Sequence, residues 1–268
     1  MEKKFKLGVI GAGYMASAIL NGAISSGIID KSQILVSDVS DLSLQKISNL
    51  GIKTTKNNSD IASNCDFILF AVKPQNFKEI AIDLSSYDCK KIISIMAGVK
   101  KETIKQYFTN CMVARCMPNA PCFVGNGAVG IDLTDFNDKL DVDFIKNLFS
   151  ACAVVIEVNE DLLGVVTGIS GSAPAYFYLF AKGIIDAGVK NGLSVAQATQ
   201  FVVNTMIGSG KMLQSCTDKT IEELISSVCS KGGTTIEAIN VYNDNNLSYI
   251  TDKAVGACIK RSKELENL

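Results

Sequence analysis

Residues 5–16 read FKLGVIGAGYMA, and this stretch decides the fold. A short apolar run ends at Gly11 and a helical pattern follows, so the stretch predicts a strand, a tight turn and a helix. Gly11 suits the turn, Gly13 lets a ligand approach the backbone, and Ala16 lets the helix pack closely on the strand. The helix start adds free N–H groups and a positive dipole, which suit the pyrophosphate of a dinucleotide. The alternative is an ordinary glycine-rich turn.

Runs rich in β-forming residues then recur, separated by helical or loop segments, until about residue 158. They lie at 34–38, 65–72, 91–96, 111–117, 127–132 and 153–158. Alternation of strands and helices is typical of a parallel sheet covered on both faces. The sequence therefore predicts an α/β protein, with an N-terminal Rossmann-type dinucleotide-binding domain over residues 1–158.

Strand runs cease after residue 158, and helix signals continue to the C-terminus. Ser194 with Gln197, and Thr220 with Glu223, each have the spacing of a capping box. A last helix is expected from Tyr249 onward. We predict an all-helical substrate and dimerisation domain over residues 159–268.

The first helical segment of that domain is apolar on more than one face. A surface helix carries one apolar stripe. A bundle of about 110 residues has little interior in which to bury the apolar side chains on the other faces of this helix. We therefore expect a homodimer joined through this domain, or a larger assembly built from such dimers. The apolar residues are Ala173, Ala175, Phe177, Phe180, Ala181, Ile184 and Ile185.

Composition excludes several classes of function. The 268 residues contain no histidine, which rules out Ser-His-Asp hydrolysis and histidine-ligated zinc. With 26 basic and 27 acidic residues, the chain lacks the basic balance of a nucleic-acid-binding protein. The nine cysteines form no C-x-x-C and lie in or beside apolar runs, which indicates core thiols in a reducing cytoplasm and no bound metal. No uninterrupted apolar run has the length of a membrane helix, so we expect a soluble protein.

Asp38 ends the second strand run, at the place where cofactor choice is usually made. A carboxylate there suits the ribose 2′-hydroxyl of NADH and repels the 2′-phosphate of NADPH. Ser37, Ser40 and Ser43 lie nearby, but hydroxyl groups compensate poorly for a negative charge. The residues therefore favour NADH, with NADPH left open. The alternative is that Asp38 turns outward and caps the next helix.

Five further segments resemble, in order, those of the pyrroline-5-carboxylate reductase family. They are AVKPQ at 71–75, ISIMAGV at 93–99, RCMPNAP at 115–121, EDLLGVVTGISGSAPAYFYLF at 160–180 and CSKGGTTIEAI at 229–239. The chain departs from the family's usual residues at Ala120, Ala173 and Lys231. The resemblance implies an NAD(P)H-dependent oxidoreductase acting on a C=N bond. Hydride would pass to the cyclic imine 1-pyrroline-5-carboxylate and give L-proline, the last step of proline biosynthesis, an amino-acid biosynthesis pathway.

The anionic substrate calls for an anion site, and the segment before Ile236 offers one. Glycines expose backbone N–H groups there, and the helix start adds its dipole and two hydroxyls. By resemblance Thr234 and Thr235 bind the substrate carboxylate, with Ser230 and Gly233 beside them. Without a ligand, the threonines would simply cap the helix.

The resemblance also makes Thr167 the candidate catalytic proton donor to the imine nitrogen, with Glu160 and Ser172 lining the substrate site. A bound water is the alternative donor, and Thr167 could instead bond to a helical carbonyl. On a regular helix Thr167 and Ser172 would point about 140° apart. Both can face one site only if Gly168, Gly171 or Pro174 disturbs the helix.

The remaining residues implied by resemblance belong to the cofactor site, together with the glycine loop. The full set is Gly11, Gly13, Tyr14, Met15, Ser37, Asp38, Asn58, Ala71, Val72, Lys73, Pro74, Met96 and Ala97. Arg115 and Asn119 are expected to order the loop at the carboxyl edge of the sheet.

Two rival hypotheses remain. A dehydrogenase of the 3-hydroxyacid type also joins a dinucleotide domain to a helical one, but it calls for a lysine base on the connecting helix. Here the nearest lysine is Lys182, well past the SGS segment. A non-catalytic dinucleotide sensor would not need the GGTT anion site.

Overall fold

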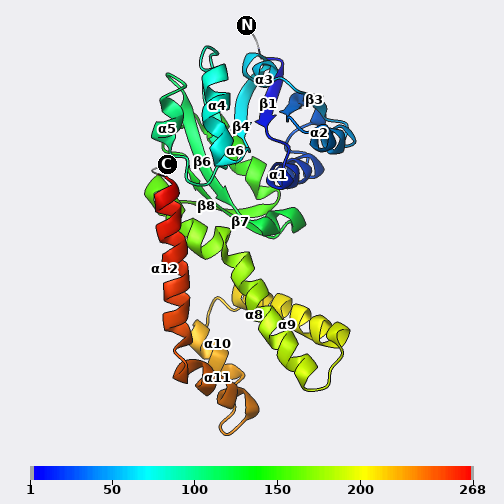
Figure 1. The fold of residues 1–268 in the computed structure, drawn as a ribbon, viewed down its shortest axis with the longest axis vertical. Helices are drawn as coiled ribbons and strands as arrows, with labels where there is room; N and C mark the ends of the chain where they lie inside the picture. Colours follow the sequence, from blue (N-terminus) through cyan, green and yellow to red (C-terminus); the bar gives the residue numbers. More distant parts are fainter. Residues whose placement is uncertain (1–2, 267–268) are drawn as a thin grey trace. The chain divides into compact units, whose positions relative to one another are not determined.

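The computed structural model describes residues 3–266, and an eight-stranded sheet organises its N-terminal part (Figure 1). The strand order is β3-β2-β1-β4-β5-β6-β7-β8. The strands are β1 (Phe5–Ile10), β2 (Ile34–Ser37), β3 (Lys53–Thr55), β4 (Cys65–Phe70), β5 (Lys91–Ser94), β6 (Met112–Pro118), β7 (Gly127–Asp132) and β8 (Ala153–Glu157).

The prediction of a parallel sheet is confirmed for β1 to β6 and is wrong for one pairing. β7 runs antiparallel to β6, with Cys116 opposite Ile131, and β8 then runs parallel to β7. Only a short 3₁₀ turn, Ala120–Val124, joins β6 to β7. That link is too short for the crossover that a parallel pair needs, so the chain must turn back on itself.

Helices cover both faces of this sheet, and each face has its own apolar core. On one face α1 and α6 pack through residues such as Ile19, Leu20 and Leu148. On the other face α3, α4 and α5 pack through residues such as Ile61, Phe77 and Ile104. The helices of this part are α1 (Tyr14–Ser25), α2 (Asp41–Ser48), α3 (Asn58–Asn64), α4 (Pro74–Leu84), α5 (Lys101–Lys105) and α6 (Lys139–Ser150).

All later elements are helical, as predicted. Both predicted capping boxes form, at Ser194 with Gln197 and at Thr220 with Glu223. These helices are α7 (Leu163–Val166), α8 (Ala173–Lys190), α9 (Val195–Ser215), α10 (Ile221–Ser227), α11 (Thr234–Asp244) and α12 (Leu247–Leu265).

By their internal contacts the described residues form two compact units. The sheet unit runs to Pro174 and takes in the chain from Cys258 onward, and the helical unit is Ala175–Ala257. The first turns after β8 and the end of α12 thus pack with the sheet. We retain residues 1–158 and 159–268 as the proposed division between a dinucleotide-binding and a helical domain.

The helical unit exposes many large apolar side chains. On α8, Phe177, Tyr178, Leu179 and Phe180 are consecutive and all exposed. Successive helical residues are about 100° apart, so four in a row surround the helix. Phe201 on α9 is 66% exposed as well. Such a surface is typical of one that another protein chain covers.

One helical stretch of the described residues, 160–190, is long and apolar enough to cross a membrane by length and composition alone. Lys182 interrupts the apolar run of this stretch, so the stretch holds no uninterrupted apolar run as long as a membrane helix. Its average hydropathy nevertheless stays high. The exposed apolar side chains of α8 contribute to that average.

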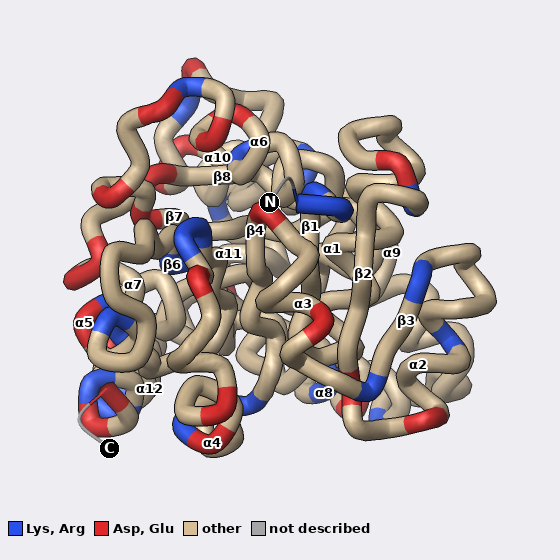
Figure 2. Tube along the Cα trace, turned by 90° about the horizontal axis from the view of Figure 1, so that it is seen from above, with Lys and Arg blue, Asp and Glu red and all other residues tan. Residues whose placement is uncertain are grey.

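Six of the nine cysteines are buried, as the core interpretation predicts, and Cys216, Cys229 and Cys258 are half-buried. Charged residues of both signs are interspersed along the trace, and no long basic stretch stands out (Figure 2).

Candidate functional site: a dinucleotide pocket and a buried charge network

The glycine loop after β1 adopts the conformation that its residues predict. Gly11 has φ +101°, and a Cβ atom there would lie 2.7 Å from the carbonyl oxygen of Ala71. Gly13 is the N-cap of α1 and has open space where a Cβ would stand. Glycine is therefore required at Gly11 by the fold, whereas at Gly13 it leaves room for a ligand at the helix N-terminus.

A cavity of about 330 Å³ opens beside this loop, at the carboxyl ends of β1, β2 and β4. Ligands of open α/β sheets collect at this edge. Eight of the predicted cofactor residues line it: Gly11, Gly13, Ser37, Asp38, Asn58, Ala71, Val72 and Lys73. Ile10, Val39, Asn76 and Ile80 line it too and were missed. Asn76 and Ile80 are four residues apart on α4, so helical spacing from the AVKP segment is the signal that could have found them.

Asp38 is fixed beside the glycine loop. One carboxylate oxygen accepts a hydrogen bond from the Ala12 N–H at 2.7 Å, and the other accepts from the Ser40 N–H at 2.8 Å. The side chain that caps α2 is Ser40, which accepts from the Ser43 N–H. Asp38 thus neither turns outward nor caps α2, and its charge stands at the pocket wall.

Two neighbouring predicted residues bond to each other. Ser37 is fully buried, and its hydroxyl donates to Asn58 Oδ1 at 2.7 Å. The hydroxyl of Ser37 therefore positions Asn58, which is the more accessible of the two at the pocket.

The other five predicted cofactor residues lie outside the lining of this cavity. Tyr14 is exposed and stacks on Phe123, with ring centroids 4.5 Å apart. Met96 is buried in one core, so a cofactor contact there would fall to its backbone, and Met15 is half-buried against the other core. Pro74 begins α4, and Ala97 follows Met96.

The chain around Thr167 leaves the regular helix, as the shared-site hypothesis requires. Residues Thr167–Gly171 form a π-helical turn, and the Ser172 N–H donates to the Thr167 carbonyl at 2.9 Å. This i to i+5 bond brings Thr167 and Ser172 onto nearly the same side of the helix. The Thr167 hydroxyl donates to the Leu163 carbonyl at 2.8 Å, and Ser172 Oγ accepts from the Cys258 thiol at 3.2 Å.

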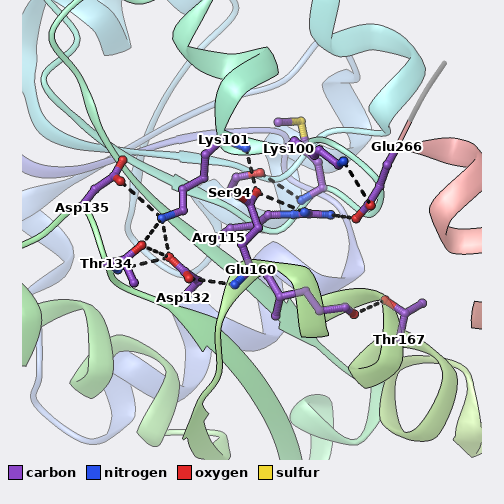
Figure 3. Close-up of polar contacts among 12 residues, drawn as sticks. Ser94, Lys100, Lys101, Arg115, Asp132, Thr134, Asp135, Glu160, Thr167 and Glu266 are labelled. Atoms are coloured by element: carbon purple, nitrogen blue, oxygen red, sulfur yellow. Dashed lines mark hydrogen bonds and ion pairs between the residues drawn. The ribbon is translucent and has the colours of Figure 1, made fainter.

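Glu160 belongs to a buried charge network in the sheet unit (Figure 3). Its carboxylate accepts a hydrogen bond from Arg115 Nη1 at 3.1 Å and another from the Lys101 backbone N–H at 2.8 Å. Arg115, which is 4% exposed, also donates to Glu266 at 2.8 Å. The sequence placed Arg115 at this edge but missed both of its partners, which lie 45 and 151 residues further along the chain.

The second half of the network centres on Lys101, whose amine pairs with Asp132 and Asp135 and donates to Thr134. Burial opposes the charge of Lys101, but the bonds and charges of the two aspartates outweigh it and raise its pKa. Burial likewise opposes ionisation of Asp132, and the bonds from Lys101 and Thr134 outweigh it, which lowers the pKa of that carboxyl.

The predicted anion segment lies in the helical unit and has an open helix start. Gly233 is the N-cap of α11, with no side-chain cap, so the first N–H groups of the helix are not capped by a side chain. The Gly233 N–H donates to the Ser230 carbonyl at 2.9 Å, and a Cβ at Gly233 would collide with the Ser230 side chain. Thr234 and Thr235 are exposed at this helix start.

Comparison with known proteins agrees with these features. Residues 160–265 match the family model "Pyrroline-5-carboxylate reductase dimerisation", and residues 6–98 match "NADP oxidoreductase coenzyme F420-dependent". Solved structures of less than 25% identity, such as a prephenate dehydrogenase from Aquifex aeolicus (17%, TM-score 0.52), share the fold.

Much closer relatives extend over the whole chain. Pyrroline-5-carboxylate reductase from Staphylococcus aureus (strain COL) is 34% identical and covers 98% of both chains, and pyrroline-5-carboxylate reductase 3 from Xenopus laevis is 32% identical over 97% of this chain and 95% of its own. The solved pyrroline carboxylate reductase of Plasmodium falciparum, with NADP bound, has a TM-score of 0.88 at 30% identity and covers 99% of this chain and 100% of its own. The architecture, the nucleotide loop and this full-length similarity coincide, and the chain belongs to the pyrroline-5-carboxylate reductase family.

Proposed function

We propose that the protein reduces 1-pyrroline-5-carboxylate to L-proline with a nicotinamide cofactor, as a homo-oligomer. The observation that carries the proposal is the glycine-lined pocket at the carboxyl edge of the sheet, within a chain similar over its full length to reductases of this name. When bound, the reduced cofactor supplies a hydride to the imine carbon, and the nitrogen gains a proton.

The residues present fit a dinucleotide. Gly13 offers open space at the start of α1, where backbone N–H groups and the helix dipole favour a pyrophosphate. Asp38 and Asn58 stand where a ribose would be held, and Ala71, Val72 and Lys73 form the adjacent wall.

Within the substrate site we propose Thr167 as the proton donor, with Glu160 and Ser172 beside it. The π-helical turn at Thr167–Gly171 supports the pairing of Thr167 with Ser172. Because the Thr167 hydroxyl donates to Leu163, it must rotate to reach an imine nitrogen. A bound water is the alternative donor.

A direct assay tests the reaction. Protein mixed with 1-pyrroline-5-carboxylate and NADH or NADPH should consume the reduced cofactor, followed by its loss of absorbance, and should form L-proline. Tight cofactor binding without turnover would favour the dinucleotide sensor instead.

For the cofactor we propose a preference for NADH, based on the charge of Asp38. Asp38→Ser should raise the ratio of kcat/KM for NADPH to that for NADH by about tenfold, since a carboxylate near a phosphate costs on the order of 1–2 kcal/mol. Kinetics with both cofactors at fixed imine measures this ratio.

Asp38→Asn is the matched control, because it removes the charge but keeps the size of the side chain and an oxygen for one of the two bonds from Ala12 and Ser40. Both variants should shift the ratio the same way. An unchanged ratio in both would remove the basis of the NADH preference.

For the substrate carboxylate we propose the start of α11, with Ser230, Gly233, Thr234 and Thr235. Thr235→Val should raise KM for the imine by on the order of tenfold or more, since a hydrogen bond to a charged group contributes about 1.5–3 kcal/mol. Cofactor affinity should stay nearly unchanged. Steady-state kinetics and cofactor titration separate the two effects, and equal weakening of both would assign the loop to the dinucleotide.

We further propose that the oligomer is a homodimer, or a set of such dimers, joined through the helical domain. The family model that matches residues 160–265 and the apolar side chains around α8 support this. The GGTT loop would then face the dinucleotide domain of the partner chain. Light scattering of dilute protein should give at least twice the 28.7 kDa of one chain. A fully active monomer would contradict the proposal, as would a dimer joined only through the sheet domains.

A further inference from the structure

The loop between β5 and α5, residues 95–100, packs against the C-terminal end of α12. Gly98 has φ +75°, and a Cβ there would stand 3.0 Å from the Cβ of Leu265 and 3.2 Å from its carbonyl carbon. The Lys100 amine lies 3.9 Å from the Glu266 carboxylate. The loop backbone therefore touches the last turn of α12 directly, with no space for a side chain between them.

Arg115 joins the two ends of this contact (Figure 3). Its side chain is 5% exposed, and the guanidinium donates a hydrogen bond to Glu266 through Nη2 and one to Glu160 through Nη1. Glu160 in turn accepts the backbone N–H of Lys101, the residue that follows the loop. The buried guanidinium of Arg115 thus binds the C-terminal turn directly at Glu266. Through Glu160 it is also linked to Lys101, which follows the loop.

The charges of this group balance, with Arg115 and Lys100 against Glu160 and Glu266. A buried guanidinium needs its carboxylates, because an unpaired buried charge is strongly unfavourable. Loss of Glu266 would leave Arg115 with Glu160 as its described partner, and it would remove the ion pairs that join Arg115 and Lys100 to the C-terminal turn.

The other end of the loop adjoins the cofactor pocket. The Ile95 N–H donates to the Phe70 carbonyl at 3.1 Å, and Ala71, the next residue after Phe70, lines the pocket. Met96 and Ala97 lie between that bond and Gly98. The loop thus connects the pocket wall to the C-terminal turn within five residues.

We propose that Glu266 is a positioning residue for the cofactor. By binding Arg115 it holds Leu265 against Gly98, and this contact sets the position of loop 95–100, whose other end is hydrogen-bonded to Phe70, the neighbour of the pocket-lining Ala71. The inference rests on the proposed use of a nicotinamide cofactor.

The test compares Glu266→Ala with Glu264→Ala, a control on the same helix whose carboxylate pairs with the exposed Arg261. Glu266→Ala should raise both KM and the dissociation constant for NADH on the order of tenfold, because a small displacement at a cofactor contact is costly. KM for the imine should rise less than the dissociation constant for NADH, because Glu160 keeps its bond from the Lys101 backbone N–H. Fluorescence titration of NADH measures binding without turnover, and Glu264→Ala should match the parent.

Two further variants separate positioning from folding. Glu266→Gln keeps an acceptor for Arg115 and should recover most of the cofactor affinity. Gly98→Ala reaches the same contact from the loop side and should also weaken NADH binding, and it should lower Tm as well because its φ of +75° disfavours a side chain. Its effect on NADH affinity should not add to that of Glu266→Ala, because both break one contact.

The proposal is overturned if Glu266→Ala lowers Tm while the dissociation constant for NADH stays at the parent value, or if the effects of Gly98→Ala and Glu266→Ala on NADH affinity add fully. It stands, and the proposed reaction fails, if cofactor affinity falls as expected in a protein that does not reduce the imine.

Discussion

Gly13→Ala should weaken NADH and NADPH binding on the order of 100-fold while leaving Tm close to that of the parent. The added methyl group meets no atom within 4 Å, so the fold accepts it. It occupies the space at the N-terminus of α1 where the pyrophosphate would lie. Displacing the pyrophosphate from two N–H groups loses about 3 kcal/mol, since each hydrogen bond to a charged group contributes about 1.5–3 kcal/mol. Fluorescence titration and thermal unfolding measure the two quantities.

Gly11→Ala is the informative contrast. Its Cβ would stand 2.7 Å from the Ala71 carbonyl oxygen, and the φ of +101° disfavours any side chain. This variant should lose stability as well as cofactor binding. If Gly13→Ala binds both cofactors as tightly as the parent, the pyrophosphate does not lie at this helix start, and the proposed cofactor geometry is wrong.

The parts of the fold that the sequence predicts well depend on local requirements. The glycine loop is one of them, because Gly11 needs a positive φ whatever surrounds it. Capping boxes at Ser194 and Thr220 likewise involve residues three apart.

Other features depend on partners far along the chain and leave little local signal. The three-residue strand β3 (Lys53–Thr55) is half-exposed at the sheet edge, and its sequence carries no apolar alternation. The reversal of β7 follows from the short link at Ala120–Val124, and the apolar pattern of the strand itself does not distinguish parallel from antiparallel pairing. The sequence implied a substrate role for Glu160, yet only the folded chain brings it to Arg115 and the Lys101 N–H.

The π-helical turn at Thr167 is intermediate between these cases. Chemistry that uses both Thr167 and Ser172 demands a disturbed helix, and the glycines at 168 and 171 indicate where the disturbance falls. In the folded chain Gly171 packs closely on Met117, where a Cβ would stand 2.6 Å from the methionine side chain. Sequence could predict that the helix is broken, but not the form of the break.

Lys101→Met should destabilise the protein by about 3–5 kcal/mol, because it leaves the buried carboxylate of Asp132 and the half-buried carboxylate of Asp135 without their shared cation. The Lys101 side chain is 7% exposed and that of Asp132 is 2% exposed. Asp135 retains its ion pair with Lys105, so the unpaired charge falls mainly on Asp132. For a chain of this size the loss lowers Tm by roughly 10 °C, which differential scanning calorimetry would measure.

The matched control is Lys90→Met, which breaks an ion pair with Asp88 in the sheet unit whose side chains are 66% and 71% exposed. Exposed pairs contribute about 0–1 kcal/mol, so Tm should hardly move. Equal losses in the two variants would show that burial of the Lys101 network adds nothing to stability.

The Tm difference between the parent and Lys101→Met should depend on pH, and the pKa shifts of Asp132 and Lys101 set the direction of that dependence. The pKa of Asp132 is lowered in the folded protein, so its contribution is present above its unfolded pKa of about 4 and is lost as pH falls through the folded value. The pKa of Lys101 is raised, so its contribution is complete below about pH 10 and is lost above the folded value. The Tm difference between parent and Lys101→Met should therefore be greatest near neutral pH and shrink below about pH 4, where Asp132 becomes protonated and no longer needs a cation. A difference that stays constant from neutral pH to pH 3 would mean that Lys101 stabilises the fold through the packing of its stem and not through its charge.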